Sequence, residues 1–246
     1  MTDDGGRRIA TAAGAMLVAS QNTGEFELAG DALFRPEYWR KNGTVTSASR
    51  GRGSTWFVAA GSADWALRHY RRGGRLAAQT SFDLYLWMGE SRVRSFVEWR
   101  LLVALRALGL PVPEPVGASY ERGLLAYRCD LITRRIVGAS PLSDRLAAGG
   151  LAPDLWRSIG TTVARFHAAG VDHADLNAHN ILITPAGSCS IIDFDRGRLR
   201  RPGSWRDANL RRLKRSLHKL TTASPPGRFT ASDWDELLSA YAGGKG

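Results

Sequence analysis

The sequence predicts an α+β protein, with antiparallel strands in its first half and a mainly helical second half. Residues 44–70 carry short β-branched and aromatic runs separated by turn residues, a pattern typical of antiparallel strands. Apolar residues recur at helical spacing over 91–108, and they do so again over 153–169 and 210–220. This order of elements, strands first and helices after them, is typical of an α+β fold.

Composition indicates a folded globular protein with anionic partners. The chain has 246 residues, of which 43% are hydrophobic and eight are Trp, enough for a substantial core. Its net charge of +11 favours a nucleotide, a nucleic acid or an acidic membrane surface as partner. Nearly all of this positive charge is arginine, so codon usage is an alternative explanation.

Neither the cysteines nor the apolar runs indicate export. Cys129 and Cys189 are far apart in the sequence and each lies in an apolar stretch, so we expect two buried, reduced thiols. No run approaches the roughly 20 apolar residues that a transmembrane helix needs. We expect 15–18 to be an early strand and not part of a signal peptide, and the protein to be cytoplasmic.

A glycine-rich turn lies between two of the expected strands. Four short runs have the composition of strands: 15–18, 44–46, 55–58 and 65–68. The turn over 50–54 contains Gly51 and Gly53. An ordinary hairpin turn explains these two glycines equally well when the motif is taken alone.

A helix is expected to begin at Ser91 and to end at Gly109, and the prolines that follow prevent its continuation. Its apolar stripe consists of Phe96, Val97, Leu101, Leu102, Leu105 and Leu108. Glu98 lies in the middle of this helix, where the default for any single glutamate is the solvent-exposed surface.

The second half follows an expected hairpin with strands over 124–127 and 130–133. A helix over 153–169, closed by Gly170, then leads the chain towards His173. A basic amphipathic helix follows around 210–220; its charged face is either a solvated surface or a contact for anionic headgroups. Ser232 and Asp235 predict a capping box for a last helix.

The stretch from His173 to Asp195 combines acidic residues with two short apolar runs. The runs over 181–183 and 190–192 flank the turn Thr184–Gly187 and predict a hairpin. Such a hairpin would place Asp175, Asn180 and Asp193 around one small volume. Carboxylate and amide oxygens are the ligands that Mg²⁺ prefers, and one acid then remains to act as a base.

These residues resemble the motifs of protein kinases, in the same order. His173-Ala174-Asp175-Leu176 followed by Asn180 resembles the catalytic loop, and Asp193-Phe194 resembles the start of D-F-G. The segment 51–58 resembles the glycine-rich loop, with Trp56 in place of its third glycine. W-A-L-R resembles V-A-I-K, with Arg68 in place of the phosphate-binding lysine.

The resemblance implies a bilobal protein-kinase-like fold with an N-lobe over 1–132 and a C-lobe over 133–246. It implies ATP and Mg²⁺ as cofactors, with the metal held by Asn180 and Asp193. Asp175 would be the catalytic base and His173 would brace its loop. Four residues would bind or orient the nucleotide phosphates: Gly51, Gly53, Arg68 and Glu98, the last by pairing with Arg68.

Two longer phrases, H-A-D-L-N-A-H-N-I-L and I-D-F-D-R-G-R, resemble the 3-deoxy-D-manno-octulosonic acid (Kdo) kinases of lipopolysaccharide core biosynthesis. That resemblance implies phosphorylation of a Kdo hydroxyl, the 4-OH in the family, on a lipid A precursor. It also implies peripheral association with the anionic cytoplasmic face of the inner membrane, and no nucleic acid is expected as a partner.

Three alternatives fit parts of the pattern. A heptose kinase of the lipopolysaccharide core shares most of the motifs. A non-catalytic kinase-like scaffold or nucleic-acid-binding protein would explain the positive charge. A metal-dependent hydrolase would use a set of five ligands: His173, Asp175, His179, Asp193 and Asp195.

Overall fold

The computed structural model describes residues 5–47, 55–61, 63–71, 83–222 and 228–244. The chain divides into two compact units. The first unit comprises Met1–Ala104 and Glu114–Arg135, and the second comprises Leu105–Pro113 and Ile136–Gly246. The expected turn with Gly51 and Gly53 lies outside the described residues.

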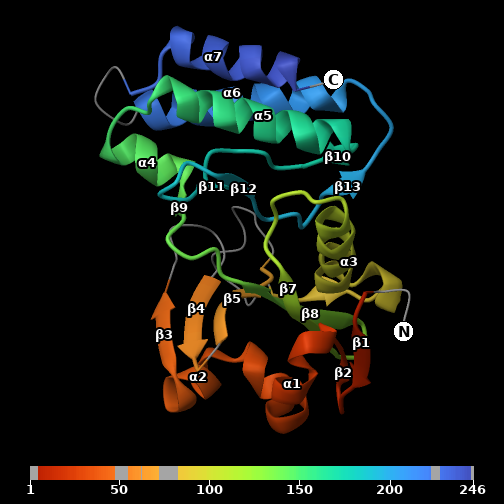
Figure 1. Cartoon of the computed structure of the whole chain (residues 1–246). Helices are drawn as coiled ribbons and strands as arrows, with labels where there is room; N and C mark the ends of the chain where they lie inside the picture. Colours follow the sequence, from red (N-terminus) through yellow and green to blue (C-terminus); the bar gives the residue numbers. More distant parts are fainter. Residues whose placement is uncertain (1–4, 48–54, 62, 72–82, 223–227, 245–246) are drawn as a thin grey trace. The chain divides into compact units, whose positions relative to one another are not determined.

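An antiparallel sheet forms the centre of the first unit (Figure 1). Its strands, among the described residues, are β1 (Arg7–Ala10), β2 (Gly14–Val18), β3 (Thr44–Ser47), β4 (Thr55–Ala60), β5 (Ala63–His69), β6 (Tyr85–Leu86), β7 (Pro115–Arg122) and β8 (Ala126–Arg134). They are ordered β1-β2-β7-β8-β5-β4-β3, and β6 also pairs with β8. The α+β class and the early strand over 15–18 are thus confirmed. Strand β8 differs from the expectation for 124–133.

The expected hairpin over 124–133 is wrong. Residues 126–134 form one continuous strand, β8, which pairs with β7 on one side and β5 on the other. Leu124 and Leu125 instead belong to the exposed connection between β7 and β8. Asp130, expected at the start of the second strand, lies inside β8, and its carboxylate accepts a hydrogen bond from the His69 ring on the neighbouring strand, 2.7 Å away.

One face of the sheet is covered by short helices that the sequence pattern did not reveal. These are α1 (Thr23–Ala29), the 3-10 turn η2 (Gly30–Phe34) and α2 (Pro36–Asn42). Trp39 of α2 meets Trp65 of β5 edge to face, with ring centroids 5.3 Å apart. Such rings bury much apolar surface, and this packing holds helices of seven residues that would be marginal alone.

The opposite face carries α3 (Arg94–Ala107), which the 3-10 turn η3 (Glu90–Arg92) precedes. Phe96 is buried against Tyr120 of β7, and the Ser95 hydroxyl donates to the Ser119 carbonyl. The expected apolar stripe is wrong at two positions, because Val97 and Leu108 are exposed. Helical spacing alone could not assign them, since single exposed apolar residues are common at protein surfaces.

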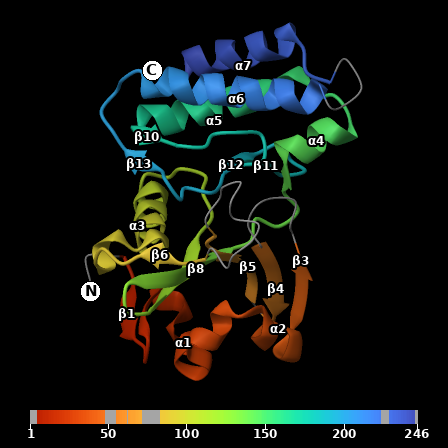
Figure 2. The same ribbon diagram turned by 180° about the vertical axis from the view of Figure 1, so that it is seen from behind.

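The second unit is mainly helical. Its described helices are α4 (Leu142–Ala148), α5 (Pro153–Ala168), α6 (Trp205–Thr222) and α7 (Ala231–Gly243). Figure 2 shows α5, α6 and α7 packed side by side. Short strands accompany them: β9 (Ser140–Pro141), β10 (Val171–Asp172), β11 (Ile181–Ile183), β12 (Cys189–Ile191) and β13 (Arg198–Leu199).

The last helix begins with a capping box two residues before the expected one. Thr230 and Asp233 form it, because the Thr230 hydroxyl accepts from the Asp233 amide and the Asp233 carboxylate accepts from the Thr230 amide. Ser232 and Asp235 lie inside α7 instead. The sequence contains both spacings, and only the extended backbone at Thr230 selects between them.

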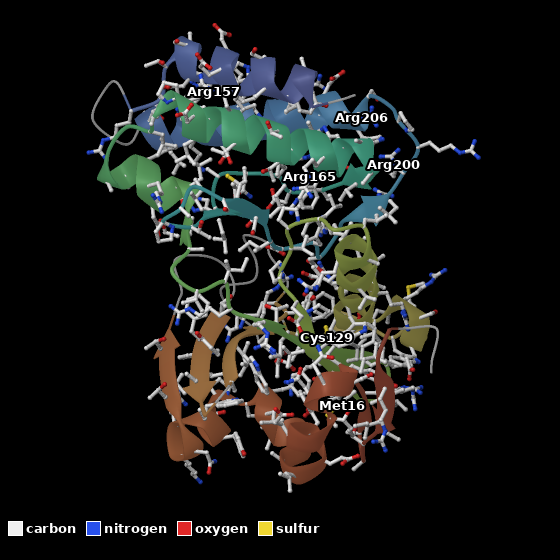
Figure 3. All side chains as sticks on the ribbon, viewed as in Figure 1. Met16, Cys129, Arg157, Arg165, Arg200 and Arg206 are labelled. Atoms are coloured by element: carbon white, nitrogen blue, oxygen red, sulfur yellow. The ribbon has the colours of Figure 1, made fainter. Side chains whose placement is uncertain are left out.

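Both cysteines are buried and free, as expected. Cys129, labelled in Figure 3, is fully buried in β8, and burial raises the pKa of its thiol to about 12. The thiol therefore stays protonated at neutral pH and behaves as an apolar side chain. Among the described helices, none is long and apolar enough to span a membrane.

Candidate active site

The predicted catalytic loop begins where α5 ends. Gly170 adopts a positive φ of 78°, which closes α5 and turns the chain into β10. A side chain at this position would also collide with the backbone, since a Cβ would lie 2.6 Å from the Arg200 carbonyl oxygen. Glycine is therefore required both by the backbone conformation and by the close approach of Arg200, which directly follows β13 (Arg198–Leu199).

Side-chain amides fix the backbone around Asp175. Its carbonyl oxygen accepts from Asn180 Nδ2 at 2.9 Å and from Asn177 Nδ2 at 3.0 Å. The Asp175 carboxylate is exposed, and it forms no hydrogen bond or ion pair with any residue that the structure describes. The backbone is thus fixed while the acid group stays available for another molecule.

His173 connects this loop to the Asp193 segment. Its Nδ1 accepts from the Asp175 amide at 3.2 Å, so Nε2 carries the proton and donates to the Ile192 carbonyl at 2.9 Å. The ring also packs on Phe194, with centroids 4.7 Å apart. Burial lowers the pKa of His173, which therefore remains a neutral imidazole at physiological pH.

Asn180 and Asp193 come from the two ends of the β11–β12 hairpin. Ile181 pairs with Ile191, and the next amide, Ile192 N, donates to the Asn180 carbonyl at 3.0 Å. Asp193 then adopts a φ of 66°, the only positive φ at a non-glycine among the described residues. Strain of this kind is typical of functional sites.

The donor atoms of these two residues fit Mg²⁺. The Asn180 Nδ2 donates to the Asp175 carbonyl, so its Oδ1 is the atom that could serve as a ligand, and the Asp193 side chain is exposed. Magnesium is commonly held by one or two such protein oxygens together with substrate phosphates. The hydrolase alternative fits less well, because both His173 ring nitrogens already bond to the backbone.

Two polar residues of α6, the buried Asn209 and the half-buried Ser216, hold the backbone of the loop, and the sequence pattern did not reveal them. Asn209 Oδ1 accepts from the His173 amide at 3.1 Å, and its Nδ2 donates to Asp172 at 3.0 Å. Ser216 Oγ accepts from the Ala178 amide at 3.1 Å. Asn209 and Ser216 are seven residues apart and lie on the same face of α6 as its buried leucines. This spacing was the one sequence feature that could have indicated that both face the protein interior.

A pair of arginines ties β13 to the same loop. Arg200, labelled in Figure 3, donates to the buried Asp172 carboxylate at 2.9 Å, and Arg198 lies 3.9 Å from it. Asp172 directly precedes His173. The segment after Asp193 is therefore connected to the predicted catalytic loop through a buried charge.

The first unit contains the expected ion pair between Arg68 and Glu98. The two terminal guanidinium nitrogens of Arg68, Nη1 and Nη2, donate to Glu98 Oε1 and Oε2 at 3.1 Å each, a bidentate arrangement. Glu98 is only 2% exposed and Arg68 side-chain exposure is 22%. The helix glutamate is therefore not on the surface, and the guanidinium keeps some access to solvent.

The structure thus brings the predicted residues together in two sets. His173, Asp175, Asn180 and Asp193 lie around one loop and hairpin of the second unit, and Arg68 pairs with Glu98 in the first. A strand cation paired with a helix glutamate, together with this loop and hairpin, defines a protein-kinase-like fold.

Comparisons with known proteins define the family. Residues 36–241 match the model of the Lipopolysaccharide kinase (Kdo/WaaP) family, and the chain belongs to that family. It is accordingly a kinase, an enzyme that transfers phosphate to an alcohol group.

Similar curated proteins carry the name 3-deoxy-D-manno-octulosonic acid kinase. One from Stenotrophomonas maltophilia (strain K279a) is 52% identical over 190 residues, 76% of this chain and 75% of that protein. One from Xanthomonas campestris pv. campestris (strain B100) is 46% identical over 211 residues, 85% and 83% of the two chains. One from Xylella fastidiosa (strain M12) is 45% identical over 208 residues, 84% and 81%.

Proposed function

We propose that this kinase transfers the γ-phosphate of ATP to a Kdo hydroxyl of a lipid A precursor, in lipopolysaccharide core biosynthesis. The family membership supports ATP as donor, and the names of its relatives support Kdo as acceptor. We assign the 4-OH as the acceptor hydroxyl by resemblance to the family. The observation that carries the proposal is an exposed Asp175 carboxylate on a backbone held by Asn177 and Asn180.

In this proposal Asp175 accepts the proton of the attacking Kdo hydroxyl. Phosphoryl transfer depends on positioning and on charge neutralisation more than on covalent catalysis, so a carboxylate on a fixed backbone suffices. The neutral His173 supports the loop because its two backbone hydrogen bonds fix the Asp175 amide and the chain before Asp193.

We propose that Asn180 and Asp193 hold Mg²⁺, which when bound neutralises charge on the phosphates of ATP. Arg68, which is partly exposed, binds those phosphates, and Glu98 orients it through the bidentate pair. Gly51 and Gly53, outside the described residues, keep their predicted role next to the phosphates.

Peripheral membrane association is also part of the proposal. The segment 196–219 contains ten Arg and Lys against one Asp, in a chain of net charge +11. Leu210, Leu213 and Leu217 of α6 are buried, whereas Arg211 and Arg215 are exposed. Such a basic face attracts anionic lipid headgroups.

Cosedimentation with phosphatidylglycerol vesicles would test this membrane association. We expect the protein to sediment with the vesicles at low salt and to be released at high salt, because salt screens the attraction between charges. A protein that does not bind the vesicles at low salt would contradict the proposed association.

Replacing Asp175 tests the proposed base. We expect Asp175→Ala to lower kcat for transfer to a Kdo-bearing lipid A precursor about 100-fold or more, because general-base catalysis contributes factors of this size. Asp144→Ala, at an exposed carboxylate of α4, is the matched control and should act like wild type. Comparable kcat for Asp175→Ala and wild type would refute the assignment.

A further inference from the structure

Tyr70 touches both partners of the Arg68–Glu98 pair. It follows β5 directly and is 2% exposed. Its hydroxyl donates to Glu98 Oε2 at 2.5 Å, and the Arg68 guanidinium carbon lies 4.5 Å from the centre of its ring. One side chain therefore bonds to the carboxylate and stacks on the cation at the same time.

Local geometry explains this convergence. Residues two apart on an extended strand point to the same face, so Arg68 and Tyr70 both face α3. Residues four apart on a helix share a face, so Arg94 and Glu98 face them. The Arg94 guanidinium carbon lies 5.9 Å from the Tyr70 ring centre and 4.7 Å from that of Tyr85.

An arginine at this strand position needs more support than a lysine. A guanidinium is planar and binds phosphate through an edge, so the orientation of its plane decides what it can contact. A buried carboxylate such as Glu98 also requires hydrogen bonds to its remaining lone pairs. Tyr70 meets both requirements, since its ring packs on the face of Arg68 and its hydroxyl fixes the Glu98 carboxylate, whose bidentate pair sets the plane of the guanidinium.

We propose that Tyr70 is a positioning residue that holds Arg68 in the orientation that binds the phosphates of ATP. This inference rests on the proposed kinase function. Burial, and then the neighbouring Glu98 charge, raise the pKa of Tyr70 well above its ordinary value. The hydroxyl is therefore a permanent donor at physiological pH.

The affinity for ATP, measured by calorimetry with a non-hydrolysable ATP analogue and Mg²⁺, tests this role without turnover. Tyr70→Phe keeps the ring and removes the hydroxyl, and we expect the Kd to rise about tenfold, or about 1.4 kcal/mol. Tyr120→Phe is the matched control, because the Tyr120 hydroxyl donates to Glu90 at 2.7 Å and not to Glu98. We expect its Kd to equal that of wild type.

A second background separates positioning from folding. In the Arg68→Lys variant there is no guanidinium plane to orient, so adding Tyr70→Phe should change the Kd by less than twofold. A Tyr70→Phe protein that melts earlier but binds the analogue like wild type would overturn the inference, as would equal losses in both backgrounds. Failure of wild type itself to bind the analogue would instead overturn the proposed kinase function.

Discussion

His173 has two ring nitrogens with opposite hydrogen-bonding roles. Nδ1 accepts from the Asp175 amide and Nε2 donates to the Ile192 carbonyl, so a second ring proton would break the first bond. The ring is also buried against Phe194. Only the neutral imidazole fits this place.

This arrangement predicts a loss of stability in mild acid. The pKa of His173 is lowered in the folded protein by burial, so the unfolded chain binds more protons as pH falls below about 6.5. The contribution of the neutral His173 ring to the free energy of unfolding is therefore complete above that pH, and it is lost progressively as the pH falls below it. We expect up to about 1.4 kcal/mol of lost unfolding free energy per pH unit.

Urea unfolding at pH 5.5 and 7.5 would measure this effect. His173→Gln removes the titrating group, so the stability difference between the two pH values should be smaller than in wild type. His179→Gln, at an exposed position of the same loop, should leave the difference unchanged. An unaltered difference in His173→Gln would show that His173 is not the titrating group.

Helices α5 and α7 touch at Gly160. A Cβ at this position would lie 2.2 Å from the Leu237 carbonyl oxygen, so any side chain would push the two helices apart. In an isolated helix, Gly→Ala would gain about 1 kcal/mol from propensity. We expect Gly160→Ala to destabilise the protein by about 1–3 kcal/mol instead, because overpacking outweighs that gain.

Chemical denaturation of two glycine variants would check this contact. Gly243→Ala is the control, since Gly243 ends α7 and its would-be Cβ has no atom within 4 Å apart from its chain neighbours and the backbone of its own helix. It should be neutral or slightly stabilising. A Gly160→Ala protein as stable as wild type would mean that the helices approach less closely than in this structure.

The elements show where sequence reasoning succeeds and where it fails. Strongly periodic segments such as α5 were predicted, because their pattern reports burial directly. The short helices α1 and α2 were missed, since their stability comes from aromatic packing against β5 rather than from local propensity. The roles of Tyr70, Asn209 and Ser216 were missed. Each bonds to a residue far away in the sequence, and a polar residue within an apolar pattern does not indicate which partner it will have.

Over the whole molecule, the order of the kinase-like motifs was the most informative feature of the sequence. The predicted hairpin over 181–192 places Asn180 and Asp193 at its two ends, as observed. The order of the motifs also predicted the Arg68–Glu98 pair. The surface charge was less informative, because exposed arginines such as Arg200 also pair with buried carboxylates.

Identification of the product most directly tests whether this chain is a Kdo kinase. Wild-type protein would be incubated with ATP, Mg²⁺ and a lipid A precursor that bears Kdo and heptose, and the phosphate would be located by mass spectrometry and ³¹P NMR. We predict one new phosphate, on Kdo at the 4-OH. Phosphate on heptose would contradict the acceptor, and no consumption of ATP with either sugar would contradict the kinase activity itself.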